Sequence, residues 1–229
     1  MNIPAHLVNE HYNDRYFDVV SALEEAKLIY FKGCNVLEAL NHALPPYRIG
    51  ETGFGAGRIL VSLMAFLEGN SVTDKNIVYN SVELHPIASD RMAAILEGFR
   101  PEACEYIDLV VEAYGTIDIQ QKGWHKVVFN RSFGLITLNL WIGEALEMVD
   151  ALELPCNAWF LDGHGPKKNP DIWRPELLMA LGTKTVQGGM CATFTVAGAV
   201  RRALDTAGFT IEKVQGYGGK NSVLKGVKR

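Results

Sequence analysis

Residues 47–57 decide the fold that this sequence predicts, and they read Tyr-Arg-Ile-Gly-Glu-Thr-Gly-Phe-Gly-Ala-Gly. An extended run, Leu44 to Ile49, predicts a strand that leads into this stretch. Its glycines occupy alternate positions: Gly53, Gly55 and Gly57. The apolar run that begins at Arg58 predicts a helix. Strand, glycine turn and helix in this order are typical of a nucleotide site in a doubly wound α/β fold, because glycine lets a ligand approach the backbone closely.

The spacing of the glycines separates this loop from a dinucleotide fingerprint. That fingerprint has the pattern G-x-G-x-x-G, whereas here Glu51 precedes Gly53-x-Gly55-x-Gly57. A carboxylate at this position would repel a pyrophosphate, which disfavours an NAD-dependent dehydrogenase. It suits the cationic, amine-bearing methionine part of S-adenosylmethionine. A tight structural turn that binds no ligand is the alternative at this point.

The composition is that of an ordinary globular protein. The chain has 229 residues, of which 48% are hydrophobic and 21% charged, so we expect one domain with a substantial core. There is no apolar run of membrane-spanning length and no signal-peptide pattern, so we expect a cytoplasmic protein without membrane contact. The four cysteines form no CxxC pair and the six histidines form no HExxH motif, which predicts buried thiols and no metal site.

Charge is distributed unevenly along the chain. The net charge of −4 argues against a non-specific nucleic-acid binder. Residues 200–229, however, contain seven Lys or Arg against two Asp or Glu. This basic segment is either a phosphate-facing edge or a solvated end of the chain.

The remaining pattern predicts a Rossmann-like α/β fold with a mostly parallel, seven-stranded sheet, an antiparallel C-terminal hairpin and helices on both faces. This order is typical of class I methyltransferases. The hairpin is expected at residues 209–214 and 222–227, around a glycine-rich turn. We expect residues 1–43 to form an N-terminal cap of the same domain, and residues 44–229 to form an S-adenosylmethionine-dependent methyltransferase core.

Three acidic residues lie where predicted strands end. Glu83 follows the second predicted strand, about 26 residues after Gly57, a distance that suits an acid binding ribose hydroxyls. Glu144, after Gly143, is placed either to accept from an adenine amino group or to begin a helix. Asp162 ends an apolar strand at the sheet edge where such folds place their sites. We expect it to accept a hydrogen bond or a proton from a bound substrate, with a loop-capping carboxylate as the alternative.

The loop after this strand carries a family resemblance. Residues 160–173 read Phe-Leu-Asp-Gly-His-Gly-Pro-Lys-Lys-Asn-Pro-Asp-Ile-Trp. They resemble the Leu-Asp-Gly-Phe-Ala-Pro-x-Lys-Asn-Pro-Asp-Met-Trp signature of the MnmD-type tRNA methyltransferases, which also form the N-terminal half of bifunctional MnmC. The likeness implies methylation of the 5-aminomethyl group of wobble (2-thio)uridine in tRNA, with S-adenosylmethionine as cofactor.

The resemblance extends over most of the chain, with departures on the substrate side. Shorter matching motifs occur at residues 14–17, 50–57, 140–144, 192–204 and 207–210. His164 replaces the signature's Phe, and Gly165 its Ala. The family's Gly-Arg-Lys-Arg-Glu segment is Gly-Gly-Lys-Asn-Ser at residues 218–222. An aromatic group for base stacking and some phosphate-binding charge are therefore changed.

The strand-end positions and the resemblance together give the candidate site residues. We expect Asp162 to be catalytic by holding the acceptor amine, and His164 to be catalytic as a base or a stacking group, with a ring that only fills the place of the signature's Phe as the alternative. Cofactor binding falls on Glu51, Gly53, Phe54, Gly55, Gly57, Glu83, Gly143, Glu144 and Asp162. Substrate binding falls on Gly163, Pro166, Lys167, Lys168 and Lys220. The oxidase half of MnmC is not in this sequence, which implies a separate FAD-dependent oxidase acting upstream.

Three hypotheses remain open from the sequence. The first is a tRNA wobble-uridine N-methyltransferase, supported by the order of the motifs. The second is a methyltransferase of the same fold acting on another amine, a small molecule or a peptide, favoured by the acidic net charge and the altered loop. The third is a non-catalytic cofactor-binding protein, disfavoured because the acids around the glycine loop and Asp162 are present.

Overall fold

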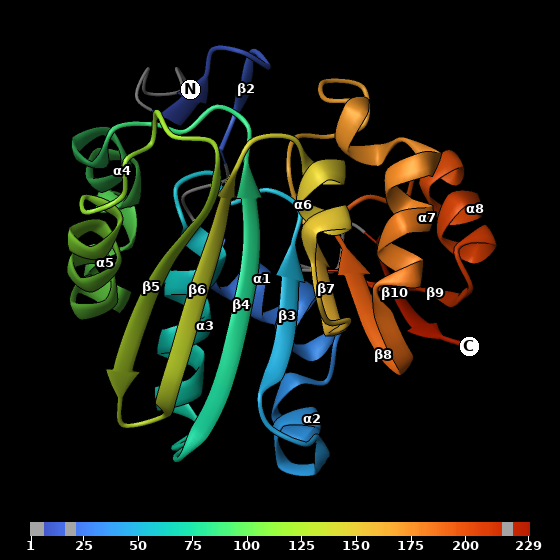
Figure 1. The fold of residues 1–229 in the computed structure, drawn as a ribbon, viewed down its shortest axis with the longest axis horizontal. Helices are drawn as coiled ribbons and strands as arrows, with labels where there is room; N and C mark the ends of the chain where they lie inside the picture. The colour runs from blue at the N-terminus through green and yellow to red at the C-terminus, as the bar shows by residue number, and fades with distance from the viewer. Residues whose placement is uncertain (1–6, 17–21, 217–221) are drawn as a thin grey trace.

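The computed structural model describes residues 7–16, 22–216 and 222–229. Its centre is an eight-stranded sheet in the order β5-β6-β4-β3-β7-β8-β10-β9 (Figure 1). The five strands from β6 to β8 are parallel, while β5 and β10 run antiparallel to their neighbours. The strands are β3 (Tyr47–Glu51), β4 (Lys75–Glu83), β5 (Gly123–Arg131), β6 (Gly134–Ile142), β7 (Cys156–Leu161), β8 (Thr185–Thr193), β9 (Phe209–Gln215) and β10 (Ser222–Lys228). A separate hairpin pairs β1 (Val8–Asn9) with β2 (Asp14–Arg15).

This architecture confirms the predicted fold class, including the antiparallel C-terminal hairpin. The described residues give the sheet eight strands where the sequence predicted seven. At one edge of the sheet, β5 pairs with β6 in an unbroken antiparallel register from Gly123 opposite Ile142 to Arg131 opposite Gly134. Most residues along β5 alternate between half-buried and exposed, because one face of this edge strand lies in solvent.

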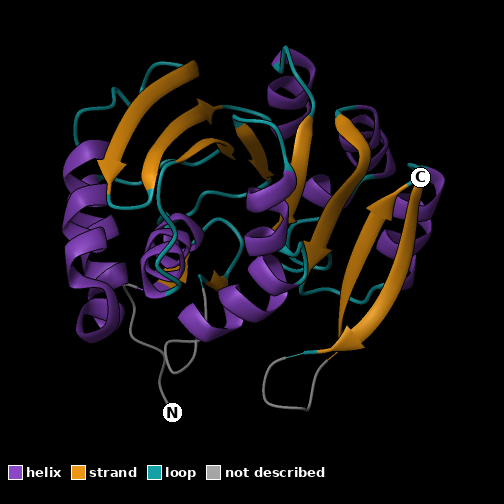
Figure 2. Cartoon of the chain, turned by 90° about the horizontal axis from the view of Figure 1, so that it is seen from below, coloured by secondary structure: helices purple, strands orange, loops and turns teal. Residues whose placement is uncertain are grey.

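Helices cover both faces of the sheet (Figure 2). One face packs against the helices that precede α6, and the other against α6, α7 and α8, each with its own hydrophobic cluster. The helices are α1 (Ala22–Ala26), η2 (Lys27–Lys32), α2 (Val36–His42), α3 (Arg58–Gly69), α4 (Ser89–Leu96), η3 (Glu97–Phe99), α5 (Arg100–Tyr114), α6 (Ala145–Ala151), η4 (Asp171–Trp173), α7 (Pro175–Thr183) and α8 (Gly198–Thr206).

The N-terminal segment shares its core with the sheet. Tyr30 and Phe31, in the π-helical turn η2, are fully buried. Their rings lie 5.5 Å and 5.7 Å from the ring of Phe160 in β7. Residues 22–42 therefore pack as part of the same domain as the strands. The boundary between residues 43 and 44 stays a prediction.

All four cysteines are free. Cys34, Cys156 and Cys191 are buried as expected. The expectation is wrong for Cys104, which is exposed because it lies on the solvent side of α5. Among the described residues, no group of three or more His, Cys, Asp or Glu is placed to hold a metal ion. In the same part of the chain, no helix is long and apolar enough to cross a membrane.

Close packing between β3 and β7 requires a glycine at position 50. A Cβ atom at Gly50 would lie 2.3 Å from the ring of Trp159, which is fully buried. We expect Gly50→Ala to lower the free energy of unfolding by roughly 1–3 kcal/mol through overpacking, as measured by urea unfolding. Gly69→Ala is the matched control, because a Cβ there meets nothing within 4 Å. Equal unfolding midpoints for the two variants would contradict this account.

Candidate functional site

A pocket of about 820 Å³, including its open mouth, lies at the carboxyl ends of β3, β4, β6 and β7. It brings together nine of the residues that the sequence assigned to a site: Gly53, Phe54, Gly55, Glu83, Gly143, Glu144, Asp162, Gly163 and His164. The β1–β2 hairpin and its flanks add Asn9, Tyr12 and Tyr16, to which sequence analysis gave no role in the site. In Figure 1, β2 lies at the end of the sheet to which β3 and β4 point.

Other predicted site residues lie off the pocket wall. Gly57 lies just outside it, at the start of α3, with φ of +74°. Pro166, Lys167 and Lys168 lie between the two parts of their loop that line the pocket, and both lysines are exposed. The Lys168 Nζ donates to the backbone oxygen of Asn13 over 3.0 Å, so this amine is engaged by the hairpin. The prediction for Lys220 lies outside the described residues.

The glycine loop packs closely against the chain that follows β7. A Cβ at Gly53 would lie 3.2–3.3 Å from backbone atoms of the 162–163 segment, and Gly55 has a φ of +56° that favours glycine. The Thr52 hydroxyl donates to the backbone oxygen of Asp162 over 2.8 Å, which ties the loop to the end of β7. The ring of Phe54 is buried and stacked on Tyr114, so this residue anchors the loop in the core.

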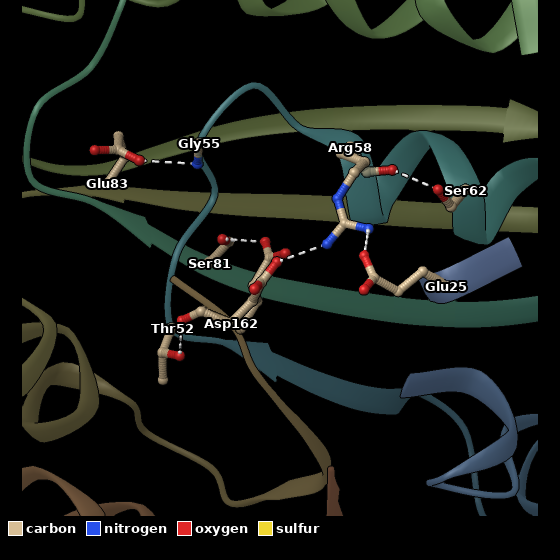
Figure 3. A network of polar contacts seen from close by, with 9 residues as sticks. Glu25, Thr52, Gly55, Arg58, Ser62, Ser81, Glu83 and Asp162 are labelled. Atoms are coloured by element: carbon tan, nitrogen blue, oxygen red, sulfur yellow. Dashed lines mark hydrogen bonds and ion pairs between the residues drawn. The ribbon is translucent and has the colours of Figure 1, made fainter. Parts of the chain in front are cut away.

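Glu83 is held by backbone amides on both oxygens. The Gly55 amide donates to Oε2 over 2.8 Å (Figure 3). The His85 amide donates to Oε1 over the same distance. Burial raises the pKa of Glu83, and these hydrogen bonds oppose that rise. Each oxygen of a carboxylate can accept a second hydrogen bond. The arrangement therefore fits two neighbouring hydroxyls of a ribose.

Glu144 has more partners than the sequence suggested. Its two oxygens accept from the guanidinium of Arg174 over 3.0 and 2.8 Å. It also caps α6 by accepting from the Leu146 amide over 3.0 Å. Burial raises the pKa of Glu144, but Arg174 and the amide outweigh that effect and lower it. The helix-start alternative is thus observed, and contact with an adenine stays a prediction.

Glu51 lies behind the glycine loop and not on the pocket wall. Its side chain is 1% exposed, and the Ser81 hydroxyl donates to Oε2 over 2.5 Å. Among the described residues Oε1 has no hydrogen-bond partner. Burial raises the pKa of Glu51 to about 8. The side chain therefore supports the glycine loop from behind, and contact with a cationic amine of the cofactor stays a prediction.

Asp162 is oriented by a buried arginine (Figure 3). The Arg58 Nη2 lies 3.0 Å from Oδ2 of Asp162, and its Nη1 lies 3.7 Å from Oε2 of Glu25 in α1. The Arg58 side chain is only 8% exposed. Its backbone oxygen accepts from the Ser62 hydroxyl. The candidate catalytic carboxylate is therefore fixed at the pocket wall before any ligand arrives.

Sequence reasoning missed Arg58 and Glu25, although one signal was present. Arg58 is the first residue of α3, where the helix dipole disfavours a cation. An arginine there, in front of an apolar helix, requires carboxylate partners. The signal shows that a partner exists, but it does not identify Asp162, which lies 104 residues further along the chain.

The loop after β7 meets the N-terminal hairpin at His164. The His164 Nδ1 lies 3.3 Å from Oδ2 of Asp14 in β2. The Trp173 Nε1 donates to the His164 backbone oxygen over 2.8 Å. Ring centroids of Tyr12 and Tyr16 lie 4.7 Å and 6.1 Å from the His164 ring. An aromatic wall thus faces the pocket, with two of its rings supplied from the hairpin side.

Comparison with known proteins gives concordant results. A family model described as S-adenosyl-L-methionine-dependent methyltransferase matches residues 101–229, more than half of the chain. The chain is 35% identical, over 220 residues, to the tRNA 5-methylaminomethyl-2-thiouridine biosynthesis bifunctional protein MnmC of Pseudomonas putida, covering 95% of this chain and 33% of that protein. MnmC of Chromobacterium violaceum is also 35% identical, over 94% of this chain and 32% of the relative. The chain thus spans about a third of the length of these relatives.

A solved structure extends this likeness to the fold. MnmC2 from Aquifex aeolicus superposes with a TM-score of 0.73 at 20% identity, covering 96% of this chain and 65% of that one. At this level of identity the match shows a shared fold. The eight-stranded sheet and its helices thus have a counterpart among solved structures.

The burial of Glu51 predicts a pH-dependent stability. Its carboxyl is neutral in the folded protein up to a pKa of about 8 but ionises near its ordinary value of 4.5 when unfolded. The folded state therefore binds more protons between these values. We expect stability to fall, relative to Glu51→Gln, by up to about 1.4 kcal/mol per pH unit as pH rises from about 4.5 to about 8, and then level off.

Urea unfolding of both proteins across this range checks the expectation. Glu68→Gln, at an exposed position of α3, is the control. Parallel pH profiles for the wild type and Glu51→Gln would show that Glu51 titrates alike in both states.

Removal of the buried guanidinium should destabilise the fold. Arg58→Met leaves the carboxylates of Asp162 and Glu25 without their shared cation, and we expect a loss of about 3 kcal/mol in urea unfolding. The control is Arg100→Met, because Arg100 forms surface pairs with Glu97 and Asp108. That change should leave the unfolding midpoint almost unmoved. A midpoint equally unmoved in Arg58→Met would mean that solvent replaces the cation.

Proposed function

Because this chain belongs to a family of S-adenosyl-L-methionine-dependent methyltransferases, we propose that it methylates the 5-aminomethyl group of wobble (2-thio)uridine in tRNA. The printed name of its relatives, tRNA 5-methylaminomethyl-2-thiouridine biosynthesis protein, supports this acceptor. The chain spans about a third of those proteins. Their activity is therefore carried over here as a proposal.

One observation carries the proposal. Asp162 lines the same pocket as the glycine loop and Glu83. A carboxylate that can receive an amine thus adjoins the wall suited to a nucleoside. This juxtaposition is what methyl transfer to an amine requires, because the reaction depends on holding two reactants in line.

The residues of the pocket fit the cofactor by their chemistry. Glu83 would accept hydrogen bonds from the ribose hydroxyls, and Gly53 and Gly55 would let the ligand approach the backbone. Gly143 and Glu144 would border the adenine, while Glu51 would support the glycine loop from behind. When bound, S-adenosylmethionine supplies an electrophilic methyl group.

On the acceptor side, Asp162 would accept an N–H of the aminomethyl group and so direct its lone pair. Its ion pair with Arg58 keeps the carboxylate in place. Gly163 and His164 border this part of the pocket. The exposed side chains of Lys167 and Lys168 would face the tRNA backbone beside the pocket.

Two further elements belong to the proposal. A separate FAD-dependent oxidase would act upstream and supply the 5-aminomethyl group, since the matched relatives are bifunctional. Action on tRNA would place the protein in the cytoplasm.

Another amine acceptor is the alternative, and His164 is the observation that favours it. A ring packed against Tyr12 and Tyr16 stands where the family signature has Phe. Lys168, a candidate phosphate contact, is already engaged by Asn13. Both features would suit a small primary amine.

Methyl transfer from labelled S-adenosylmethionine to tRNA bearing 5-aminomethyluridine tests the proposal. We expect label in the wobble nucleoside, with Asp162→Asn at least about a hundredfold slower, because a positioned carboxylate is lost. Asp150→Asn, at an exposed position of α6, is the matched control and should be as active as the wild type. Tight cofactor binding without label in tRNA would overturn the acceptor and direct the search to small amines.

A further inference from the structure

We propose that Asp14 is a positioning residue that fixes the tautomer and orientation of His164, so that Nε2 of His164 takes a proton from the ammonium form of the amine acceptor. The proposal deepens the proposed function, on which it rests for the chemistry of the acceptor. Neither the role of Asp14 nor a pairing with His164 follows from the sequence, because 150 residues separate the two.

The geometry is that of a carboxylate–imidazole pair held on both sides. Oδ2 of Asp14 lies 3.3 Å from Nδ1 of His164, and Oδ1 of Asp14 accepts from the Arg15 amide over 3.1 Å. The carboxylate is thereby fixed at the end of the hairpin. On the other side, the Trp173 indole holds the backbone oxygen of His164. The His164 side chain is 11% exposed, so the ring has little freedom to turn.

This pairing decides which ring nitrogen carries the proton. A carboxylate only accepts hydrogen bonds, so Nδ1 of His164 must be the donor to Asp14. In the neutral ring, Nε2 is then an acceptor with a free lone pair. No described residue hydrogen-bonds to Nε2. His164 lines the same pocket as Asp162, where the acceptor amine is expected.

Burial keeps the His164 ring neutral near pH 7. Burial lowers the pKa of His164, as does the charge of Lys168, while Asp14 and Asp162 raise it to a smaller extent. The rings of Tyr12 and Tyr16 complete its surroundings on the hairpin side. The net effect is a lowered pKa, so the base form dominates at neutral pH.

The proton transfer gives Asp162 and His164 separate tasks. A primary alkylamine is protonated at neutral pH, as lysine is, and its ammonium has no lone pair for attack. One N–H bond of the ammonium breaks, the electron pair stays on nitrogen, and Nε2 of His164 receives the proton. The imidazolium then returns that proton to solvent. Asp162 accepts a hydrogen bond from a second N–H and aligns the amine.

Nitrogen NMR of the histidine side chains tests the pair without any acceptor. We expect wild-type His164 to be the Nδ1–H tautomer with a pKa below the ordinary value. Asp14→Asn removes the negative charge, so the pKa of His164 should fall further and both tautomers should appear. Asp14→Glu should restore the single tautomer. Glu10→Gln, on the same hairpin, is the matched control and should leave the tautomer unchanged. A wild-type ring protonated at Nε2 would overturn the proposal.

The pH dependence of kcat tests the consequence for catalysis. We expect a rate that rises with pH through the pKa of His164. In Asp14→Asn this rise should move to lower pH, and the plateau should fall roughly tenfold to a hundredfold. In His164→Phe the rise should be lost, while affinity for S-adenosylmethionine stays unchanged in both variants.

The outcomes separate this proposal from the proposed function. A pH profile of the same shape in the wild type and His164→Phe would assign the base elsewhere and overturn the role of His164. If the wild type methylates no tRNA while NMR shows the Nδ1–H tautomer, the proposed acceptor fails and the positioning by Asp14 stands. The same pH series is then run with a small primary amine.

Discussion

The geometry of the site depends on the ion pairs that the buried guanidinium of Arg58 forms. It begins α3, where the helix dipole disfavours a cation, and carboxylates from α1 and the end of β7 stabilise it there. One side chain thus connects three segments that are distant in sequence. The glycine loop and Asp162 cannot move independently, because the arginine follows the loop directly and binds the aspartate.

The pocket divides into two walls of different origin. The wall that we propose for the cofactor is built from the ends of parallel strands, which are buried on both faces and therefore rigid. The wall that we propose for the acceptor combines the loop after β7 with the N-terminal hairpin, and it contains His164, where the chain departs from the family signature. Changes on this wall can alter the acceptor while the sheet and the glycine loop keep their form. Such a division lets one fold serve several methyl acceptors.

Local patterns in the sequence were enough to predict the fold and most of the residues that line the pocket. Glycine spacing and apolar runs depend on neighbouring residues, so the loop, Glu83 and Asp162 were placed correctly at strand ends. The burial of Glu51, the pairing of Glu144 with Arg174 and the contact of Asp14 with His164 depend on tertiary packing. No pattern within a short window specifies them. The predicted total of seven strands was one too low.

The contacts of Glu83 affect how ligand affinities of variants at this position should be interpreted. The carboxylate that is suited to a ribose also holds the Gly55 amide, so it shapes the loop before a ligand binds. The loop is therefore already ordered in the folded protein, so little further conformational entropy is lost when a ligand binds. A truncation at this position would remove a ligand contact and also release the loop. The loss of binding free energy would then exceed the contribution of the ligand contact alone. Only a double-mutant cycle could separate the two contributions.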